Sequence, residues 1–139
     1  MKETIMTRWL GELSFEAEVD GHKIYLDSSA EQGGKNMGPR PKLMMMVALA
    51  GCTGMDVASL LRKMRVEVEE LTVEVNGDVA EEHPKKFEKM KVTFRVKGKN
   101  VSSSSVKKAV DLSKNKYCGV SANYLKAFPI EHEIIIEES

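Results

Sequence analysis

The stretch RPKLMMMVALAGCTGMDVASLLRKM, from Arg40 to Met64, predicts a long helix and holds one of the two cysteines of the chain. Pro41 suits the first helical position, because that position needs no backbone N–H. Every residue from Leu43 to Ala50 is apolar, so this part of the helix needs cover on all sides. A small domain cannot supply that cover alone, and we expect a second copy of the chain to provide it.

Beyond this apolar run the helix becomes amphipathic. Cys52, Asp56 and Lys63 follow one another at helical spacing and share one face. The thiol therefore lies where the buried half of the helix meets a polar stripe. Gly51 and Gly54 flank it, and each costs about 1 kcal/mol relative to alanine in a helix interior. The two glycines indicate close packing of the helix, access of a substrate to the sulfur, or both.

The remaining pattern predicts an α+β fold. FEAEVDGHKIYL (15–26) is typical of a hairpin that turns at Asp20-Gly21. LTVEVNG (71–77) and MKVTFRVKG (90–98) alternate in polarity and predict half-buried strands. The serine run at 102–105 predicts a helix cap, with a short helix from about Cys118 to Lys126 and a last strand at IEHEIIIEE (130–138). We expect helices packed on a mostly antiparallel sheet.

Length and composition limit the classes of function. The 139 residues fit a single domain, 1–139, and 42% of them are hydrophobic. The 21 basic and 21 acidic residues cancel, which argues against nucleic acid and against an anionic membrane surface as partners. The apolar run Leu43–Cys52 is shorter than the roughly 20 residues of a membrane span, and the first residues do not form a signal peptide. We therefore expect a cytoplasmic protein, in which two cysteines form no structural disulfide.

Thiol chemistry needs the thiolate, and burial raises the pKa of a cysteine above its ordinary value of about 8.5. Cys52 lies deep inside its helix, so a cation such as Arg40 or Arg8 would have to assist its ionisation. Cys118 opens a short helix, whose N-terminus favours a negative charge on its sulfur. A buried cysteine that serves only as a small apolar side chain is the alternative.

The three histidines, at positions 22, 83 and 132, have no metal-ligand spacing to either cysteine, and we expect them to be exposed. The cysteines themselves stand 66 residues apart, which is neither a CxxC motif nor a zinc knuckle. We therefore expect no metal.

Together with AVDLSKNKYCGVSANYLKA (109–127), the opening stretch resembles the OsmC-like family, which includes the organic hydroperoxide resistance proteins. The resemblance covers nearly the whole chain. It implies an OsmC-like fold, in which mostly antiparallel sheets wrap around long central helices of an intertwined homodimer. It also implies a thiol peroxidase that reduces organic hydroperoxides without a cofactor. Cys52 would be the peroxidatic thiol and Cys118 the resolving thiol, and a dithiol, in better-known members a lipoylated protein, would be the reductant.

The residues before Cys52 include the expected substrate site and one difference from the sequence pattern of the family. Met45, Met46 and Leu49 would line an apolar wall that suits an alkyl hydroperoxide. Typical peroxidase members have a glutamate directly after the proline that opens the helix, and Lys42 stands at this position, ten residues before Cys52. Arg40 would then help to stabilise the thiolate.

This difference keeps a second function open, a non-catalytic module of the same fold that binds an apolar small molecule at the dimer interface. A third function is a redox sensor or protein disulfide exchanger. It would need exposed thiols of low pKa, and the apolar surroundings of Cys52 argue against exposure.

Overall fold

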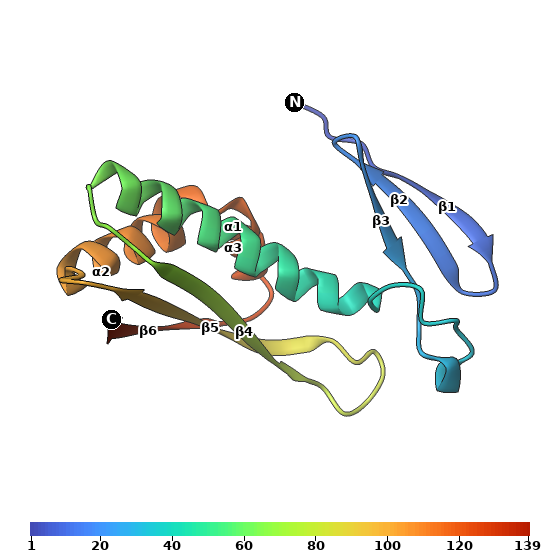
Figure 1. Ribbon diagram of the computed structural model, residues 1–139. Helices are drawn as coiled ribbons and strands as arrows, with labels where there is room; N and C mark the ends of the chain where they lie inside the picture. The colour runs from blue at the N-terminus through green and yellow to red at the C-terminus, as the bar shows by residue number, and fades with distance from the viewer. The chain divides into compact units, whose positions relative to one another are not determined.

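The computed structural model describes all 139 residues. Their contacts divide the chain into two compact units, Met1–Met45 and Met46–Ser139, and helix α1 (Pro41–Lys63) begins in the first unit and continues into the second (Figure 1). The bounds of α1 confirm the long helix expected from about Pro41 to Met64. The expectation that residues 1–139 form one domain stays a prediction.

The first unit contains a three-stranded antiparallel sheet in the order β1-β2-β3. Its strands are β1 (Met6–Gly11), β2 (Ser14–Val19) and β3 (His22–Leu26). Asp20 and Gly21 join β2 to β3 with φ angles of 50° and 79°, the positive values that a two-residue turn of type I′ requires. This turn confirms the expected hairpin. Strand β1 adds an edge that the sequence pattern did not predict.

A buried carboxylate organises the loop that follows β3. Asp27 is only 2% exposed, and its side chain accepts a hydrogen bond of 2.6 Å from the hydroxyl of Ser14. The backbone N–H groups of Ser28, Lys35 and Met37 also donate to it. These bonds, that of Ser14 first, lower the pKa of Asp27 against the opposing effect of burial. One ionised side chain thus holds the loop that contains the 3₁₀ turn η1 (Ala30–Gln32).

The second unit contains the sheet on which the helices pack, in the order β4-β5-β6. Strands β4 (Glu70–Val79) and β5 (Phe87–Gly98) are antiparallel, and β5 pairs in parallel with β6 (Ile130–Glu138). Between β5 and β6 the chain forms α2 (Ser103–Leu112), the π-helical turn η2 (Ser113–Tyr117) and α3 (Gly119–Tyr124). Such a helical crossover is what parallel strands require. The mostly antiparallel pairing is confirmed, with β5–β6 as the exception.

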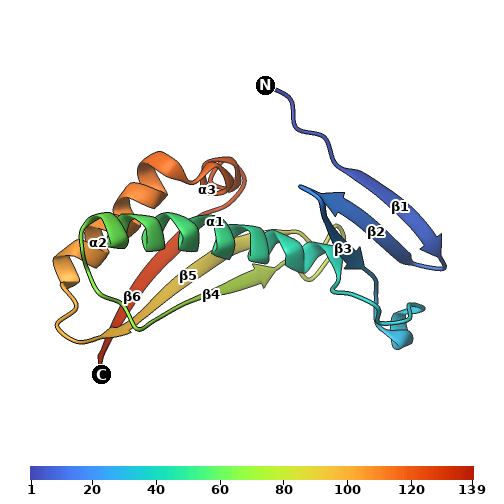
Figure 2. The same cartoon turned by 45° about the horizontal axis from the view of Figure 1, so that its top comes forward.

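The core of the second unit lies between this sheet and the helices, which cover one of its faces (Figure 2). Strand β5 contributes alternate side chains with no exposed surface: Met90, Val92, Phe94 and Val96. Helix α1 contributes the face Leu49, Thr53, Val57 and Leu61. A Cβ on Gly54 would lie 3.2 Å from Cγ2 of Val73 in β4, whereas one on Gly51 would meet open space. Close packing therefore explains Gly54, and Gly51 belongs to an uncovered face.

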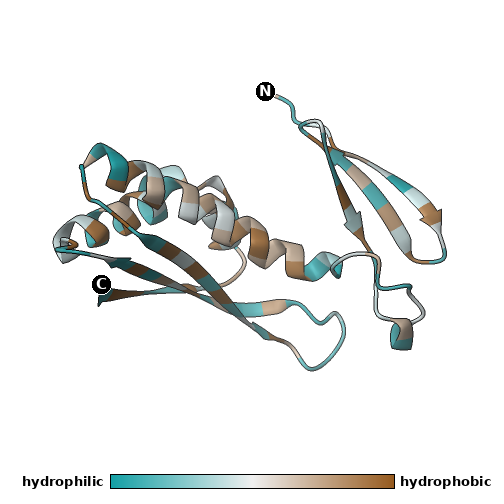
Figure 3. Cartoon of the chain, in the orientation of Figure 1, coloured by the Kyte–Doolittle hydropathy of each residue, from teal (hydrophilic) through white to brown (hydrophobic).

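Part of α1 remains apolar and open in the single chain. Val47 is 58% exposed and Met55 76% exposed, and the helix is among the most hydrophobic segments of the chain (Figure 3). By length and composition α1 is also able to cross a membrane, a test that the core helices of soluble proteins pass as well. The apolar run Leu43–Cys52 alone is too short to cross a membrane, and the helix reaches the required length only with the residues up to Lys63. That the protein has no membrane partner stays a prediction.

Candidate functional site

The fold of the second unit brings the two cysteines into contact. Cys52 lies in α1 and is half-buried, whereas Cys118 is the N-cap of α3 and is 3% exposed. Their Sγ atoms are 3.0 Å apart, and both are free thiols. A disulfide requires an S–S distance of about 2.05 Å, so a shift of roughly 1 Å would bring the sulfurs to bonding distance.

The turn η2 places Cys118 against α1. The backbone N–H of Cys118 donates to the carbonyl of Ser113 at 2.9 Å, which closes the turn. The side chain of Ser113 is buried and donates to Oδ2 of Asp56, also at 2.9 Å. Since Asp56 lies one helical turn after Cys52, this bond ties the turn to the part of α1 that carries the thiol. Short π-helical segments of this kind are frequent at functional sites.

Cys118 also takes part in capping its own helix. Its sulfur accepts a hydrogen bond of 3.2 Å from the backbone N–H of Ser121. Two hydrogen bonds therefore hold Cys118, one through its backbone N–H and one through its sulfur.

The electrostatic surroundings of Cys52 favour the protonated thiol. Burial raises the pKa of Cys52 above its ordinary value, and the contact with Cys118 adds to this. The negative charge of Asp56 acts in the same direction, whereas the backbone N–H of Val120 lowers the pKa. None of these causes is a basic side chain. The cation that the sequence led us to expect beside this thiol is not among the groups that act on it.

A third polar side chain completes the cluster. The two Sγ atoms and a carboxylate oxygen of Asp56 all lie within 4.8 Å of one another. We call Cys52, Asp56 and Cys118 the thiol–carboxylate cluster.

The other predicted site residues are placed as follows. Arg40 is exposed and lies just before α1, and Arg8 is exposed and pairs with Glu16 at 3.2 Å. Met45 and Met46 are half-buried, and Leu49 is fully buried in the core. The roles of Arg40 in activating the thiol and of Met45, Met46 and Leu49 in binding substrate stay predictions.

Sequence reasoning found Asp56 only as a neighbour of Cys52 on the helix, and it did not single out Ser113. The helical spacing of four residues was the signal for Asp56. No comparable signal exists for Ser113, since its partner is 57 residues away and only the fold brings the two together.

The histidines lie apart from the cluster. His22 and His83 are exposed, as expected. His132 is half-buried, and both of its ring nitrogens are buried without a hydrogen-bond partner, so the expectation of exposure was wrong for this residue. Burial first, and then the charge of Lys114, lower its pKa, against the opposing effect of Asp111. His132 faces a groove of about 850 Å³ between α2 and β6 that neither cysteine lines.

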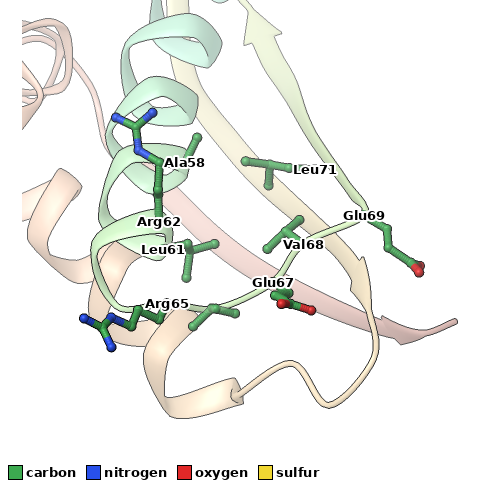
Figure 4. A pocket seen from close by; sticks show the side chains of 9 residues that line it. Ala58, Leu61, Arg62, Arg65, Glu67, Val68, Glu69 and Leu71 are labelled. Atoms are coloured by element: carbon green, nitrogen blue, oxygen red, sulfur yellow. The ribbon is translucent and has the colours of Figure 1, made fainter.

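A second hollow, of about 540 Å³, lies between the end of α1 and the start of β4 (Figure 4). The apolar side chains of Leu61, Val68 and Leu71 approach one another there, and the carboxylate of Glu69 points away from them. Neither cysteine lines this hollow, and it contains no nucleophile. The chemistry of the second unit therefore centres on the thiol–carboxylate cluster.

Comparison with known proteins shows the family to which this chain belongs. The profile of the family described as OsmC-like protein matches residues 33–133, so the chain belongs to the OsmC-like family.

Among its relatives is the Escherichia coli K12 protein named Protein YhfA, which is 36% identical over 126 residues, 90% of this chain and 91% of that protein. A hypothetical protein from Aquifex aeolicus VF5 shares the fold with a TM-score of 0.88 at 24% identity, over 100% of this chain and 98% of that chain. The organic hydroperoxide resistance protein OhrB of Bacillus subtilis also shares the fold, with a TM-score of 0.62 at 16% identity, over 96% of this chain and 98% of that chain. These likenesses confirm the expected α+β, OsmC-like fold.

Proposed function

We propose that the chain is a thiol peroxidase that reduces organic hydroperoxides through Cys52 and Cys118. The observation that carries this proposal is the 3.0 Å distance between the two sulfur atoms. A peroxidatic thiol needs a resolving thiol within reach, and this pair meets the requirement with a small movement. Membership of a family that includes hydroperoxide resistance proteins supports the same reaction.

The proposed reaction has two chemical steps. The Cys52 thiolate attacks the outer oxygen of the hydroperoxide, the O–O bond breaks, and the alkoxide takes up a proton and leaves as an alcohol. Cys52 is then a sulfenic acid. The sulfur of Cys118 attacks it, water leaves, and a Cys52–Cys118 disulfide forms. The two thiols have together given two electrons to the peroxide, and an external dithiol returns them by thiol–disulfide exchange.

Turnover in the presence of a lipoyl dithiol tests this proposal. We expect the wild-type protein to consume cumene hydroperoxide catalytically and the Cys52→Ser variant to be inactive. Cys118→Ser should form the sulfenic acid but no intramolecular disulfide. Equal consumption by the wild-type and Cys52→Ser proteins would refute the assignment of Cys52.

A homodimer in a reducing compartment such as the cytoplasm is part of the proposal. Trp9, Phe15 and Leu26 occupy one cross-strand row of the first sheet, and Trp9 is 63% exposed. Val47 and Met55 on α1 are also open in the single chain. A contiguous row of exposed apolar side chains such as that on the first sheet is typical of an interaction surface. Sedimentation analysis should give a dimer of the wild-type protein and a weaker dimer of Met55→Glu.

One observation favours the alternative, a non-catalytic module that binds an apolar small molecule. The pKa of Cys52 is raised, and none of the groups that cause the shift is basic. At neutral pH such a thiol is a poor nucleophile unless a further group activates it. Unchanged thiols after peroxide treatment, together with thermal stabilisation by a medium-chain carboxylic acid, would favour this alternative.

A further inference from the structure

The thiol–carboxylate cluster has the composition of a metal site as well as that of a redox pair. Cys52 and Asp56 are one helical turn apart on α1, and Cys118 faces them from the N-cap of α3. Their ligating atoms lie within 4.8 Å of one another. Thiolate sulfur and carboxylate oxygen are both ligands of Zn²⁺ in proteins. The separation of the cysteines in the sequence hid this arrangement, which depends on the fold.

The dimensions of the cluster suit a tetrahedral ion after a small adjustment. Two Zn–S bonds of about 2.3 Å at a tetrahedral angle place the sulfurs about 3.8 Å apart. The sulfurs are now 3.0 Å apart, so they would separate by roughly 0.8 Å. Cys52 is half-buried, and its neighbour Gly51 presents open space rather than a packed side chain. We expect rotation of the half-buried Cys52 side chain to supply a change of this size.

The third ligand is already oriented from outside the cluster. The hydroxyl of Ser113 donates to Oδ2 of Asp56 at 2.9 Å, which fixes the carboxylate while one of its oxygens lies within 4.8 Å of both sulfurs. Hydrogen bonds of this kind to a ligating side chain are a regular feature of metal sites. The charges fit as well, because two thiolates and a carboxylate carry three negative charges that no basic side chain of the cluster offsets.

We propose that the reduced chain binds one thiophilic divalent cation, Zn²⁺, through Cys52, Asp56 and Cys118, and that formation of the Cys52–Cys118 disulfide expels it. Binding releases the protons of the two thiols. Three protein ligands leave the fourth position of the ion open to water.

The release step rests on the proposed function, because the hydroperoxide is its oxidant. The two bound thiolates lose two electrons and form the S–S bond. The hydroperoxide takes up these electrons and two protons, and the products are an alcohol, water and free Zn²⁺. The site therefore couples the redox state of the pair to metal occupancy.

Competition with a chromophoric zinc chelator tests the binding step on the reduced full-length protein. We expect one Zn²⁺ per chain, bound about 100-fold more weakly by Cys52→Ser and Cys118→Ser and at least about tenfold more weakly by Asp56→Asn. Asp111→Asn, which changes a carboxylate on α2 outside the cluster, is the matched control and should bind like the wild type. Equal affinity of the wild type and Cys52→Ser, or of the wild type and Asp56→Asn, would overturn the proposal.

The Asp56→Asn variant removes a proposed ligand together with a negative charge that attracts a cation. Asp56→Glu keeps the charge and displaces the carboxylate by one methylene, so weaker binding by that variant as well reports the loss of a ligand. If the variants fail to fold, wild-type protein alone decides the question. Zn²⁺ should then protect both cysteines from iodoacetamide, and alkylation unchanged by Zn²⁺ would overturn the proposal.

Two oxidants distinguish the failure of this inference from the failure of the proposed function. Diamide forms the disulfide without any peroxidase activity and should release the bound Zn²⁺. Release by diamide but not by cumene hydroperoxide would support the metal site and contradict the peroxidase. Zinc that stays bound after complete disulfide formation would overturn the metal site and leave the peroxidase standing.

Discussion

The hydrogen bond between Ser113 and Asp56 supports a quantitative prediction for Ser113→Ala. The bond is 2.9 Å long and its acceptor is a carboxylate. Hydrogen bonds to charged groups contribute about 1.5–3 kcal/mol to the free energy of unfolding. Because Asp56 is half-buried, water can partly replace the lost donor, and we expect the lower value, about 1.5 kcal/mol. For 139 residues this loss corresponds to a decrease in Tm of about 5 °C.

A matched serine in the same segment serves as the control. Ser103 is exposed in the first turn of α2, and Ser103→Ala makes the same side-chain truncation without loss of a buried bond. Denaturant unfolding of both variants at one chain concentration should show Ser113→Ala about 1.5 kcal/mol less stable than Ser103→Ala. The variant should also form the Cys52–Cys118 disulfide more slowly, because η2 is no longer tied to α1. Equal stability of the two variants would refute this reasoning.

Three further predictions follow from burial and charge. Leu49→Ala should lower the free energy of unfolding by about 2.7–5 kcal/mol in denaturant titrations, because the side chain is fully buried; a loss below about 1 kcal/mol would contradict its core position. Asp27→Asn should destabilise the protein at neutral pH. The pKa of Asp27 is lowered in the folded state. Its ionised side chain therefore stabilises the folded protein fully above the ordinary aspartate pKa of 3.8, and this stabilisation is lost as the pH falls through the folded-state pKa. The difference between wild type and variant should therefore shrink below about pH 4 in acid unfolding curves, and a constant difference would contradict this assignment. The alkylation rate of Cys52 should rise with pH and level off only above the ordinary pKa of a thiol. Asp56→Asn should shift this profile to lower pH, because the charge of Asp56 contributes to the raised pKa; an unshifted profile would argue against that cause.

The sequence predicted those elements that local patterns determine. Asp20-Gly21 marks a turn because its backbone needs positive φ angles, and the alternation of Met90, Val92 and Phe94 marks a strand with one buried face. Strand β1 was missed because its pattern is weak and its pairing with β2 decides its state. The parallel pairing of β6 was missed for a related reason, since strand direction depends on the crossover rather than on the strand.

The candidate site was predicted only in part. The resemblance indicated which two cysteines belong together, and helical spacing placed Asp56 beside Cys52. No local pattern predicted the bond from Ser113, the buried network of Asp27 or the partly buried ring of His132, because the partners in each case come from other elements. The expected cation beside Cys52 does not appear among the groups that shift its pKa.

Cys52 and Cys118 act as one redox pair only if a single equivalent of hydroperoxide joins them. Reduced protein treated with one equivalent of cumene hydroperoxide is analysed by intact mass and by peptide mapping under non-reducing conditions. We expect the mass of two hydrogens to be lost per chain and a peptide that links Cys52 to Cys118 to appear, whereas the Cys52→Ser variant gives no such peptide. Two unmodified thiols after exposure to excess hydroperoxide would contradict this pairing.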